Sequence, residues 1–504
     1  MSILAALRSW CWVCLNWLIE RLPFLKNAES IPGLSRYIEA QHEGMFAELE
    51  ESIKPYHQRF PRFKALPDQG LAAPQISAWV REMSSEESRV WEQGFASGSV
   101  YHGDREHMAL LNEVYALTSQ TNPLHSDIWP SINKFEAEIV AMTALMLGAD
   151  ENAPAPVGGT VTSGGSESIM LAMKTYRDYA RQKRGIKHPE AIIPLTAHAA
   201  FDKACHYFTI KKISVAVGSD YRASVEAVRL ALSRNTIVIV GSAPSFPHGV
   251  IDPIAELAAL AQQRGIGFHT DACLGGFFLP WVPEKYQVPA FDFRVPGVSS
   301  ISADTHKFGY ASKGSSVLLF RDGAMRHFQY FVSTEWPGGL YFSPTFAGSR
   351  PGALIAQCWA AMLAMGREGY QSSVAAIMLT ADYIKEGIRS IPELEILGEP
   401  LWVIAFTSKS RNIYDIMERM SRKGWHLNGL HRPPCVHICL TRLHTKPGVA
   451  ERFVEDLRAA TLEASSRGKK GEGMAPVYGM AAQIPLRGLV AKFLKKYMDK
   501  LYEV

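Results

Sequence analysis

The chain has 504 residues, of which 47% are hydrophobic and 20% are charged, values that are ordinary for a soluble globular protein with room for two domains. The formal net charge is only +4 and no stretch is dense in lysine and arginine, so the charge gives no support to nucleic-acid binding. The seven cysteines are odd in number and mostly lie in apolar runs, which predicts buried thiols in a reducing compartment. Cys11 and Cys14 form a CxxC motif, but no second pair stands at a zinc-like spacing, and we predict no metal site.

Residues 1–30 contain an apolar segment that is rich in tryptophan and interrupted by Arg8, Glu20 and Arg21. Its uninterrupted part is shorter than the roughly 20 residues that a membrane-spanning helix needs. Three interpretations stay open: a helix on or anchored to a membrane, which the tryptophans favour, a helix that packs against a partner subunit, and a signal peptide, for which no cleavage site follows. We expect a cytoplasmic protein, with this helix as the candidate for membrane association.

Residues 31–75 are rich in proline and charge and are typical of an arm that wraps another surface. Apolar residues recur about every 3.6 positions in residues 78–91 and 132–147, which predicts two helices. Between about residues 155 and 320, helical stretches alternate with short apolar runs, a pattern that predicts a mostly parallel sheet with helices on both faces. These runs are residues 191–195, 213–217, 236–241, 267–270, 299–302 and 316–320.

The pattern changes after residue 352. Helical periodicity covers residues 352–368 and 374–391, and apolar runs at 394–397, 401–407 and 436–440 flank a predicted helix at 413–423. The predicted fold class is therefore α/β, with a large domain at residues 76–352 and a small α+β domain at residues 353–504. The N-terminal helix (1–30) and the arm (31–75) precede them.

A glycine pair, Gly164 and Gly165, followed by Ser166 opens a predicted helix. Glycines let backbone N–H groups approach an anion closely, and the helix dipole favours negative charge at the same place. The segment therefore predicts an anion site, although a plain glycine turn with a helix cap explains the same residues equally well.

Polar residues also follow three of the predicted strands, where ligands gather in open α/β sheets. Asp271 follows a buried run, and its carboxylate needs a cationic partner, either a protonated pyridine nitrogen or an arginine, unless it caps a helix. Lys307, preceded by His306, lies among small residues, where an apolar pocket would lower its pKa and make it a nucleophile towards aldehydes. His198 offers a flat ring that could stack on a flat cofactor. The alternatives are a surface lysine and a structural histidine.

Together these segments resemble the fold-type I enzymes that use pyridoxal 5'-phosphate (PLP), in the branch of group II amino-acid decarboxylases and sphingosine-1-phosphate lyases. The order of the motifs matches, and the likeness covers residues from about 32 to the C-terminus. The matching segments are TSGGSESIMLA (162–172), HAAFDKA (198–204), APSFPHGVIDPI (243–254), HTDACLGGF (269–277), SADTHKFGYASKGSSVLLFRD (302–322) and FAGSRPG (346–352).

The resemblance implies a role for each matching residue. Lys307 forms a Schiff base with PLP and later moves protons, Asp271 pairs with the pyridine nitrogen, and His198 stacks on the ring. The residues implied for the cofactor phosphate are Gly164, Gly165, Ser166 and His306, with Ser349 from the second subunit of a homodimer. The residues implied for the substrate phosphate are Tyr101, Asn122, His125 and Lys313.

The closest likeness, to the lyases, implies retro-aldol cleavage of a phosphorylated long-chain base into a fatty aldehyde and phosphoethanolamine. The main alternative is a group II amino-acid decarboxylase, but Lys313, His125 and Tyr101 offer the cation and donors that a phosphate dianion needs. A catalytically idle membrane scaffold is disfavoured, because it has no need for a desolvated lysine beside a buried acid. Where some members have a tyrosine, this chain has Phe246 and His248, and no acid–base role follows for that loop.

Overall fold

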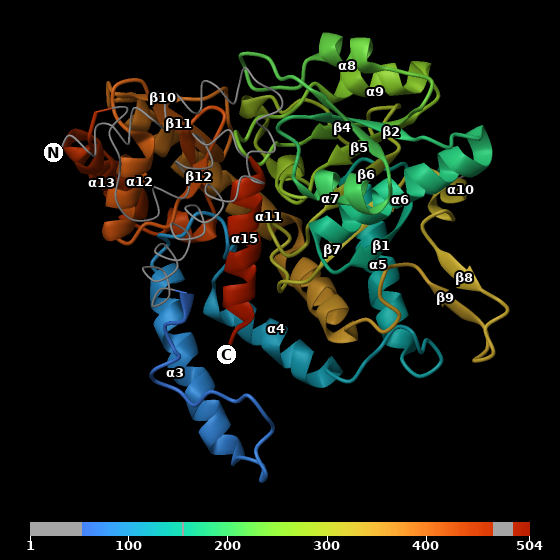
Figure 1. Ribbon diagram of the computed structural model, residues 1–504, viewed down its shortest axis with the longest axis horizontal. Coiled ribbons are helices and arrows are strands. Elements are labelled where there is room, and N and C mark those ends of the chain that lie inside the picture. Colours follow the sequence, from blue (N-terminus) through green and yellow to red (C-terminus); the bar gives the residue numbers. More distant parts are fainter. Residues whose placement is uncertain (1–52, 154–155, 467–486) are drawn as a thin grey trace, which may run out of the picture.

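The computed structural model describes residues 53–153, 156–466 and 487–504 (Figure 1). The predicted N-terminal helix, the first part of the predicted arm, Cys11 and Cys14 lie outside the described residues. The other five cysteines are buried and form no disulfide, as the composition predicted.

A seven-stranded sheet forms the centre of the large body, in the order β1-β7-β6-β5-β4-β2-β3. Its strands are β1 (Gly158–Thr162), β2 (Glu190–Pro194), β3 (Lys211–Val215), β4 (Thr236–Ser242), β5 (Gly267–Asp271), β6 (Ser300–Ala303) and β7 (Ser316–Phe320). Only β7 runs against its neighbours β6 and β1, so the prediction of a mostly parallel sheet is confirmed. Six strands were predicted within two residues, while β1 was missed because Gly158 and Gly159 carry no side chains to make an apolar run.

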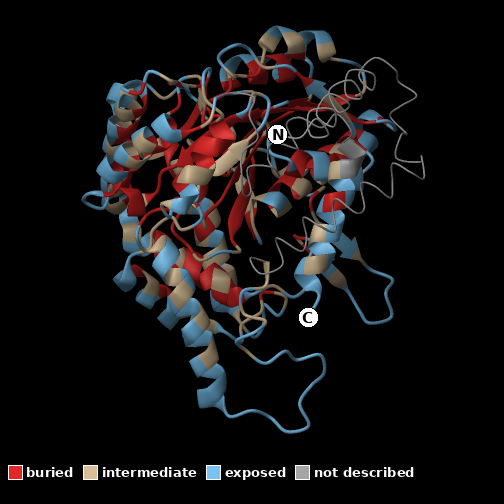
Figure 2. Cartoon of the chain, turned by 60° about the vertical axis from the view of Figure 1, so that its left-hand side comes forward, coloured by how far each residue is buried: buried red, intermediate tan, exposed pale blue. Residues whose placement is uncertain are grey.

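Helices cover both faces of this sheet, and Figure 2 shows the strands as the buried centre of the molecule. Every residue of β2, β4, β5 and β7 is buried, which explains their nearly unbroken apolar runs. The flanking helices are α5 (Pro130–Met146), α6 (Gly165–Arg184), α7 (Ala200–Tyr207), α8 (Val225–Ala231), α9 (Ile254–Gln263) and α10 (Gly323–Arg326). The helix predicted at residues 132–147 is α5, which begins two residues earlier.

A long helix, α11 (Gly352–Arg389), leads to a second, antiparallel sheet in the order β10-β11-β13-β12. Two helices were predicted here, and the interruption lies at Gly366, whose φ is 52°, rather than after residue 368. The remaining elements of this body are β10 (Leu394–Ile396), β11 (Val403–Ser408), α12 (Ile413–Arg422), β12 (Asn428–Leu430), β13 (Cys435–Cys439) and α13 (Val449–Glu463). The predicted runs and helix of this region correspond to β10, β11, α12 and β13.

Three α-helices and one hairpin also lie around these two sheets. Helix α3 (Ala73–Trp91) has no buried residue, and in Figures 1 and 2 it extends away from the body. A hairpin of β8 (Phe331–Ser333) and β9 (Tyr341–Ser343) also projects from the body in Figure 1. The other two helices are α4 (Arg105–Thr118) and α15 (Arg487–Tyr502). Among the described residues, no helix is both long and apolar enough to cross a membrane.

Candidate active site

The predicted site residues gather at one edge of the large sheet. Asp271 is the last residue of β5, and His306 and Lys307 follow β6. The glycine pair follows β1, which points the same way as β6 because both are antiparallel to β7. His198 follows β2, which is parallel to β4 and so to β5. The topology therefore brings these four segments to the carboxyl edge of the sheet, as predicted.

The glycine pair begins α6 in a way that only glycine permits. Gly164 has a φ of 147°, and a Cβ on Gly165 would lie 2.7 Å from Asp304 Oδ1 and 2.8 Å from Cys273 Sγ. A Cβ on Gly164 would lie 3.4 Å from His306 Cε1, so His306 borders the loop. Within the described residues, the N–H groups of Gly165 and Ser166 donate no hydrogen bond, because the first turn of a helix has no carbonyl to receive them. The turn therefore presents free donors at the positive end of a 20-residue helix.

Lys307 forms an ion pair with a buried carboxylate, which the sequence did not predict. Its Nζ lies 3.0 Å from Asp304 Oδ2, and the Asp304 side chain is only 3% exposed. Burial alone would lower the pKa of Lys307, but the Asp304 carboxylate outweighs burial and raises the pKa above its usual value. The predicted lowering of the lysine pKa is therefore wrong for the chain without cofactor. The other oxygen of Asp304 is buried and has no hydrogen-bond partner among the described residues.

Asp271 leaves one carboxylate oxygen available. Its Oδ1 accepts the backbone N–H of Cys273 at 3.1 Å and the hydroxyl of Ser302 at 3.5 Å. No described residue donates a hydrogen bond to Oδ2, and neither an arginine nor a lysine forms an ion pair with the carboxylate. Asp271 is 7% exposed, so its free oxygen lies in a nearly closed space. The alternative of an arginine partner is therefore wrong within the described chain.

His198 is exposed, and its ring makes one hydrogen bond and one aromatic contact. Nδ1 accepts the N–H of Ala200 at 3.1 Å, so the histidine caps the start of α7. The ring centroid lies 6.5 Å from that of Phe246 at nearly a right angle. The structural role and the predicted stacking role are compatible, because the cap uses an edge of the ring and leaves its faces free.

Lys313 and Tyr101 lie together next to the lysine loop. Lys313 Nζ stands 4.5 Å from the centroid of the Tyr101 ring, and that ring packs edge-on against Phe308 at 4.9 Å. Although the Lys313 side chain reaches solvent, desolvation of its ammonium and the nearby charge of Lys307 lower its pKa to about 8. No described carboxylate forms an ion pair with Lys313. This arrangement holds a cation available for an anionic ligand.

Asn122, His125 and Ser349 form a second group. Asn122 Nδ2 donates to Ser349 Oγ at 3.1 Å in the same chain, and Asn122 Oδ1 accepts the N–H of Arg350 at 3.2 Å. His125 is exposed, and its N–H donates to the carbonyl of Asn122. Within its own chain, Ser349 therefore lies beside a residue that was predicted for the substrate phosphate. This group and the Lys313 loop both border the first turn of α11, because Gly352 donates to the Thr121 carbonyl and Gly314 lies against Leu354.

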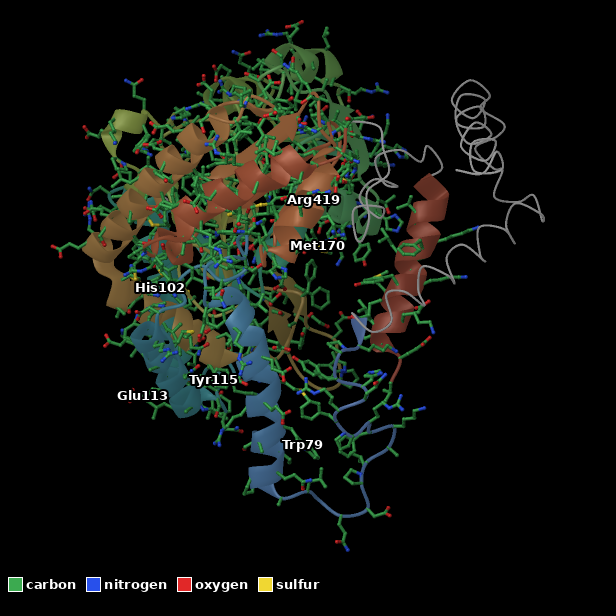
Figure 3. All side chains as sticks on the ribbon, turned by 90° about the vertical axis from the view of Figure 1, so that its left-hand side faces the viewer. Trp79, His102, Glu113, Tyr115, Met170 and Arg419 are labelled. Carbon is green, nitrogen blue, oxygen red and sulfur yellow. The ribbon has the colours of Figure 1, made fainter. Side chains whose placement is uncertain are left out.

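A cavity of about 500 Å³ lies between the glycine loop and the start of α11. Figure 3 labels Met170, which lines it from α6. Its lining is Val161, Thr162, Ser163, Ser166, Glu167, Met170, Lys203, Gly314, Thr345, Phe346, Ala347, Arg350, Pro351, Leu354 and Ile355. Among the described residues, no group of three histidine, cysteine or acidic side chains is arranged to hold a metal ion.

Sequence reasoning missed Asp304, Glu136 and Arg350. Asp304 lies three residues before Lys307, directly after a buried strand, and this spacing could have indicated an ion pair. The guanidinium of Arg350 binds both carboxylate oxygens of Glu136 at 2.8 Å, but the two residues are 214 positions apart and no local pattern connects them. Glu136 Oε1 also accepts the N–H of Val161 in β1.

Comparisons with known proteins agree with this geometry. Residues 97–409 match the pyridoxal-dependent decarboxylase conserved domain. The chain is 46% identical to the sphingosine-1-phosphate lyase of Arabidopsis thaliana, over 94% of this chain and 87% of that protein. It is also 46% identical to sphingosine-1-phosphate lyase 1 of Rattus norvegicus, over 87% of this chain and 77% of that protein.

Solved structures give the same picture. The sphingosine-1-phosphate lyase of Burkholderia pseudomallei is 41% identical and superposes with a TM-score of 0.83, over 89% of this chain and 99% of that one. The glutamate decarboxylase of Lactobacillus brevis is 22% identical with a TM-score of 0.68, over 81% of this chain and 97% of that one. At that identity the decarboxylase supports the fold alone.

Proposed function

Because this chain belongs to the sphingosine-1-phosphate lyases, within the pyridoxal-dependent decarboxylase family, we propose that it cleaves phosphorylated long-chain bases such as sphingosine-1-phosphate. The products are a fatty aldehyde and phosphoethanolamine, formed by retro-aldol cleavage. The observation that carries the proposal is the cation of Lys313, which lies over Tyr101 six residues after Lys307 and has no carboxylate partner in the described chain. A substrate without a carboxylate must be held by its phosphate, and this cation suits a dianion.

Each part of PLP has a counterpart at the sheet edge, which supports the cofactor roles that the sequence suggested. The free N–H groups at the start of α6 suit the cofactor phosphate, together with Ser166 and the adjacent His306. Lys307 Nζ suits the aldehyde, and the unpartnered Oδ2 of Asp271 suits a protonated pyridine nitrogen. When bound, PLP supplies an electron sink for the carbanion that carbon–carbon cleavage leaves.

The chain's own residues then orient the substrate and move protons. Lys313 and Tyr101 bind the substrate phosphate, and Asn122 and His125 complete the site from the loop before α5. Lys307 Nζ is the candidate to give a proton to the carbon that loses the aldehyde, because its ammonium follows β6 at the carboxyl edge of the sheet and is held by Asp304 at 3.0 Å. The group that takes the proton of the C3 hydroxyl is either Lys307 or the substrate phosphate itself.

We assign His248 no acid–base role in this chemistry. It is buried and stacks on Tyr221 with 4.3 Å between ring centroids, and burial lowers its pKa to about 4. Phe246 is the residue of this loop that faces His198, and it has no group to move a proton.

The assembly and location are also proposals. The chain is a cytoplasmic homodimer whose second subunit covers the cavity near Ser349, and residues 1–30 bring it to a membrane surface. The proposed domain division at residues 76–352 and 353–504 has its boundary at the first turn of α11.

If residues 1–30 are only a tether, deleting them leaves turnover of a detergent-dispersed substrate unchanged and reduces co-sedimentation with vesicles. A loss of turnover in detergent would assign these residues to the catalytic body instead.

The function is tested by incubating the holoenzyme with sphinganine-1-phosphate and measuring the fatty aldehyde, with carbon dioxide release from glutamate and tryptophan as the alternative. We expect aldehyde and no carbon dioxide. Lys307→Ala should abolish both the aldehyde and the visible absorbance of covalently held cofactor. Lys409→Ala is the matched control, because Lys409 is 81% exposed on the small body. Aldehyde production by Lys307→Ala, or carbon dioxide release by the wild type, contradicts the proposal.

A further inference from the structure

A buried chain of hydrogen bonds ends on Asp271. Tyr176 on α6 lies with its hydroxyl 2.5 Å from Ser300 Oγ, and Ser300 Oγ lies 2.7 Å from His269 Nδ1. On the other side of the ring, His269 Nε2 lies 3.1 Å from Ser302 Oγ, which donates to Asp271 Oδ1 at 3.5 Å. The five side chains come from α6, β5 and β6 and cross the core beneath the site edge.

The donor and acceptor of every hydrogen bond in this network follow from the Asp271 carboxylate at its end. An ionised carboxylate can only accept, so the Ser302 hydroxyl points its proton at Asp271 and must itself accept from His269. Burial lowers the pKa of His269 to about 4, so the ring is neutral and carries one proton, on Nε2. Nδ1 then accepts from Ser300, and Ser300 accepts from Tyr176. All the protons point towards Asp271.

The packing of the interior leaves room for this hydrogen-bond network. His269, Ser300 and Ser302 are fully buried, and Tyr176 is 1% exposed. A Cβ on Gly267, at the start of β5, would collide with the ring of Tyr176, so glycine at this position makes the space that the tyrosine fills. A buried polar group costs free energy unless it is hydrogen-bonded, and here each ring nitrogen of His269 has its own hydroxyl.

We propose that His269 is a positioning residue, which fixes the Ser302 hydroxyl on Asp271 Oδ1 and so turns Asp271 Oδ2 towards the ring nitrogen of PLP. The proposal rests on the proposed cofactor role of Asp271. Without His269 the Ser302 Oγ keeps the Cys273 thiol as a donor at 3.3 Å but loses the donor that directs its own proton to Asp271, so the carboxylate relies mainly on the Cys273 N–H. A hydrogen-bonded network of this kind holds the groups that do chemistry within the tolerance that catalysis requires.

The test measures cofactor binding rather than turnover. The apoprotein is titrated with PLP and with 1-deaza-PLP, in which carbon replaces the ring nitrogen. The dissociation constant of 1-deaza-PLP divided by that of PLP reports the contact of Asp271 with the ring nitrogen. In His269→Phe and Ser302→Ala we expect this ratio to fall by about 3- to 10-fold, the range of a lost hydrogen bond. His269→Gln, whose amide can still donate to Ser302, should keep most of the ratio.

Thr461→Val is the matched control, because it also removes a buried hydroxyl, but in α13 and bonded only to its own helix at 2.8 Å. It should leave the ratio unchanged. An unchanged ratio in His269→Phe and Ser302→Ala overturns the proposal, and so does an equal loss of affinity for both cofactors, which indicates general damage. Neither result bears on the cleavage reaction, since failure of that proposal appears in the aldehyde assay of the wild type.

Discussion

The carboxylate of Asp304 lies 3.0 Å from Lys307 Nζ and keeps the lysine in its ammonium form in the chain without cofactor. An amine must be neutral to attack an aldehyde, so this ion pair opposes the capture of PLP at low pH. Asp304→Asn keeps the shape and removes the charge, after which burial dominates and the pKa of Lys307 falls. The apoprotein variant should therefore capture PLP at a lower pH than the wild type.

The measurement is the rate at which visible absorbance appears after PLP is added, as a function of pH. In the wild type the rate should still rise with pH where that of Asp304→Asn has levelled off. Asp322→Asn, which changes an exposed helix cap on α10, is the control and should follow the wild type. Superimposable profiles for Asp304→Asn and the wild type would show that the ion pair does not govern the amine.

The lowered pKa of Lys313 gives the substrate site its own pH dependence. The ammonium is the form that binds phosphate, and with a pKa of about 8 it is lost as the pH rises through that value. For the free enzyme, kcat/KM should therefore fall about tenfold for each unit above pH 8. Lys313→Arg keeps its charge and should flatten this limb, while Lys313→Ala should raise KM by about 10- to 150-fold at pH 7, as expected for one charged hydrogen bond.

These pH profiles should be recorded with the cofactor absorbance monitored in parallel. Lys313→Ala should keep that absorbance, because Lys313 lies outside the proposed cofactor contacts. If kcat/KM of Lys313→Arg still falls above pH 8, a group other than Lys313 causes that fall.

The sequence could predict where the candidate site residues lie in the fold, but it could not predict their electrostatics. Asp271, His306 and Lys307 follow buried strands, and the sequence pattern alone indicates where such strands end. The raised pKa of Lys307 was not predictable from an apolar pocket, because it depends on how the chain turns after β6 to bring Asp304 back onto the lysine. The pairing of Asn122 with Ser349 likewise depends on contacts between segments 227 positions apart.

At the scale of elements, the Glu136–Arg350 ion pair joins α5, β1 and the segment before α11. Arg350 binds Glu136 with two hydrogen bonds and the carbonyl of Val161 with a third, at 3.2 Å. Both side chains are nearly buried, at 12% and 13% exposure. Since the N–H of Arg350 also binds Asn122, this ion pair fixes the loop that contains Asn122 relative to the glycine loop.

Arg350→Gln leaves the Glu136 carboxylate without its partner and should destabilise the protein by about 3 kcal/mol, the lower end of the range for a broken buried pair. The double variant with Glu136→Gln should recover part of this loss, because no uncompensated charge remains. The shift in thermal midpoint measures both effects. Lys134→Gln, in an exposed ion pair on the same helix, should change the midpoint little. Additive losses in the double variant would contradict a direct interaction.

Strands with both faces buried, such as β4 and β5, were all predicted, whereas among the partly exposed strands β3 and β10 were predicted and others were missed. The hairpin of β8 and β9 has three-residue strands that are mostly exposed, so no buried face imposes an alternating pattern on the sequence. The order of the strands and the reversed direction of β7 beside β6 could not be predicted either, because apolar runs indicate where strands lie but not which way they run.

At the scale of the whole molecule, the hairpin carries apolar side chains that the described residues leave mostly exposed. Phe331, Val332, Trp336, Leu340 and Phe342 are between 56% and 75% exposed. Exposed apolar clusters of this size are typical of surfaces that bind another protein or a membrane. The hairpin leads directly into the segment from Thr345 to Arg350 that lines the cavity, and this continuity connects the cluster to the site.

In the proposed homodimer the hairpin is covered by the second subunit, so the double variant Trp336→Ser, Phe342→Ser should weaken the dimer. We propose that the second subunit also closes the cavity that Ser166 and Arg350 line, and we therefore expect PLP to bind at least tenfold more weakly when the subunits separate. Sedimentation velocity over a concentration series gives the dimer dissociation constant, and cofactor fluorescence gives the PLP affinity of the same samples. Leu230→Ser, on α8 with 78% exposure, is the control for loss of an exposed leucine. If the double variant stays dimeric at the lowest concentration while losing PLP, the hairpin acts within its own subunit and the intersubunit role is excluded.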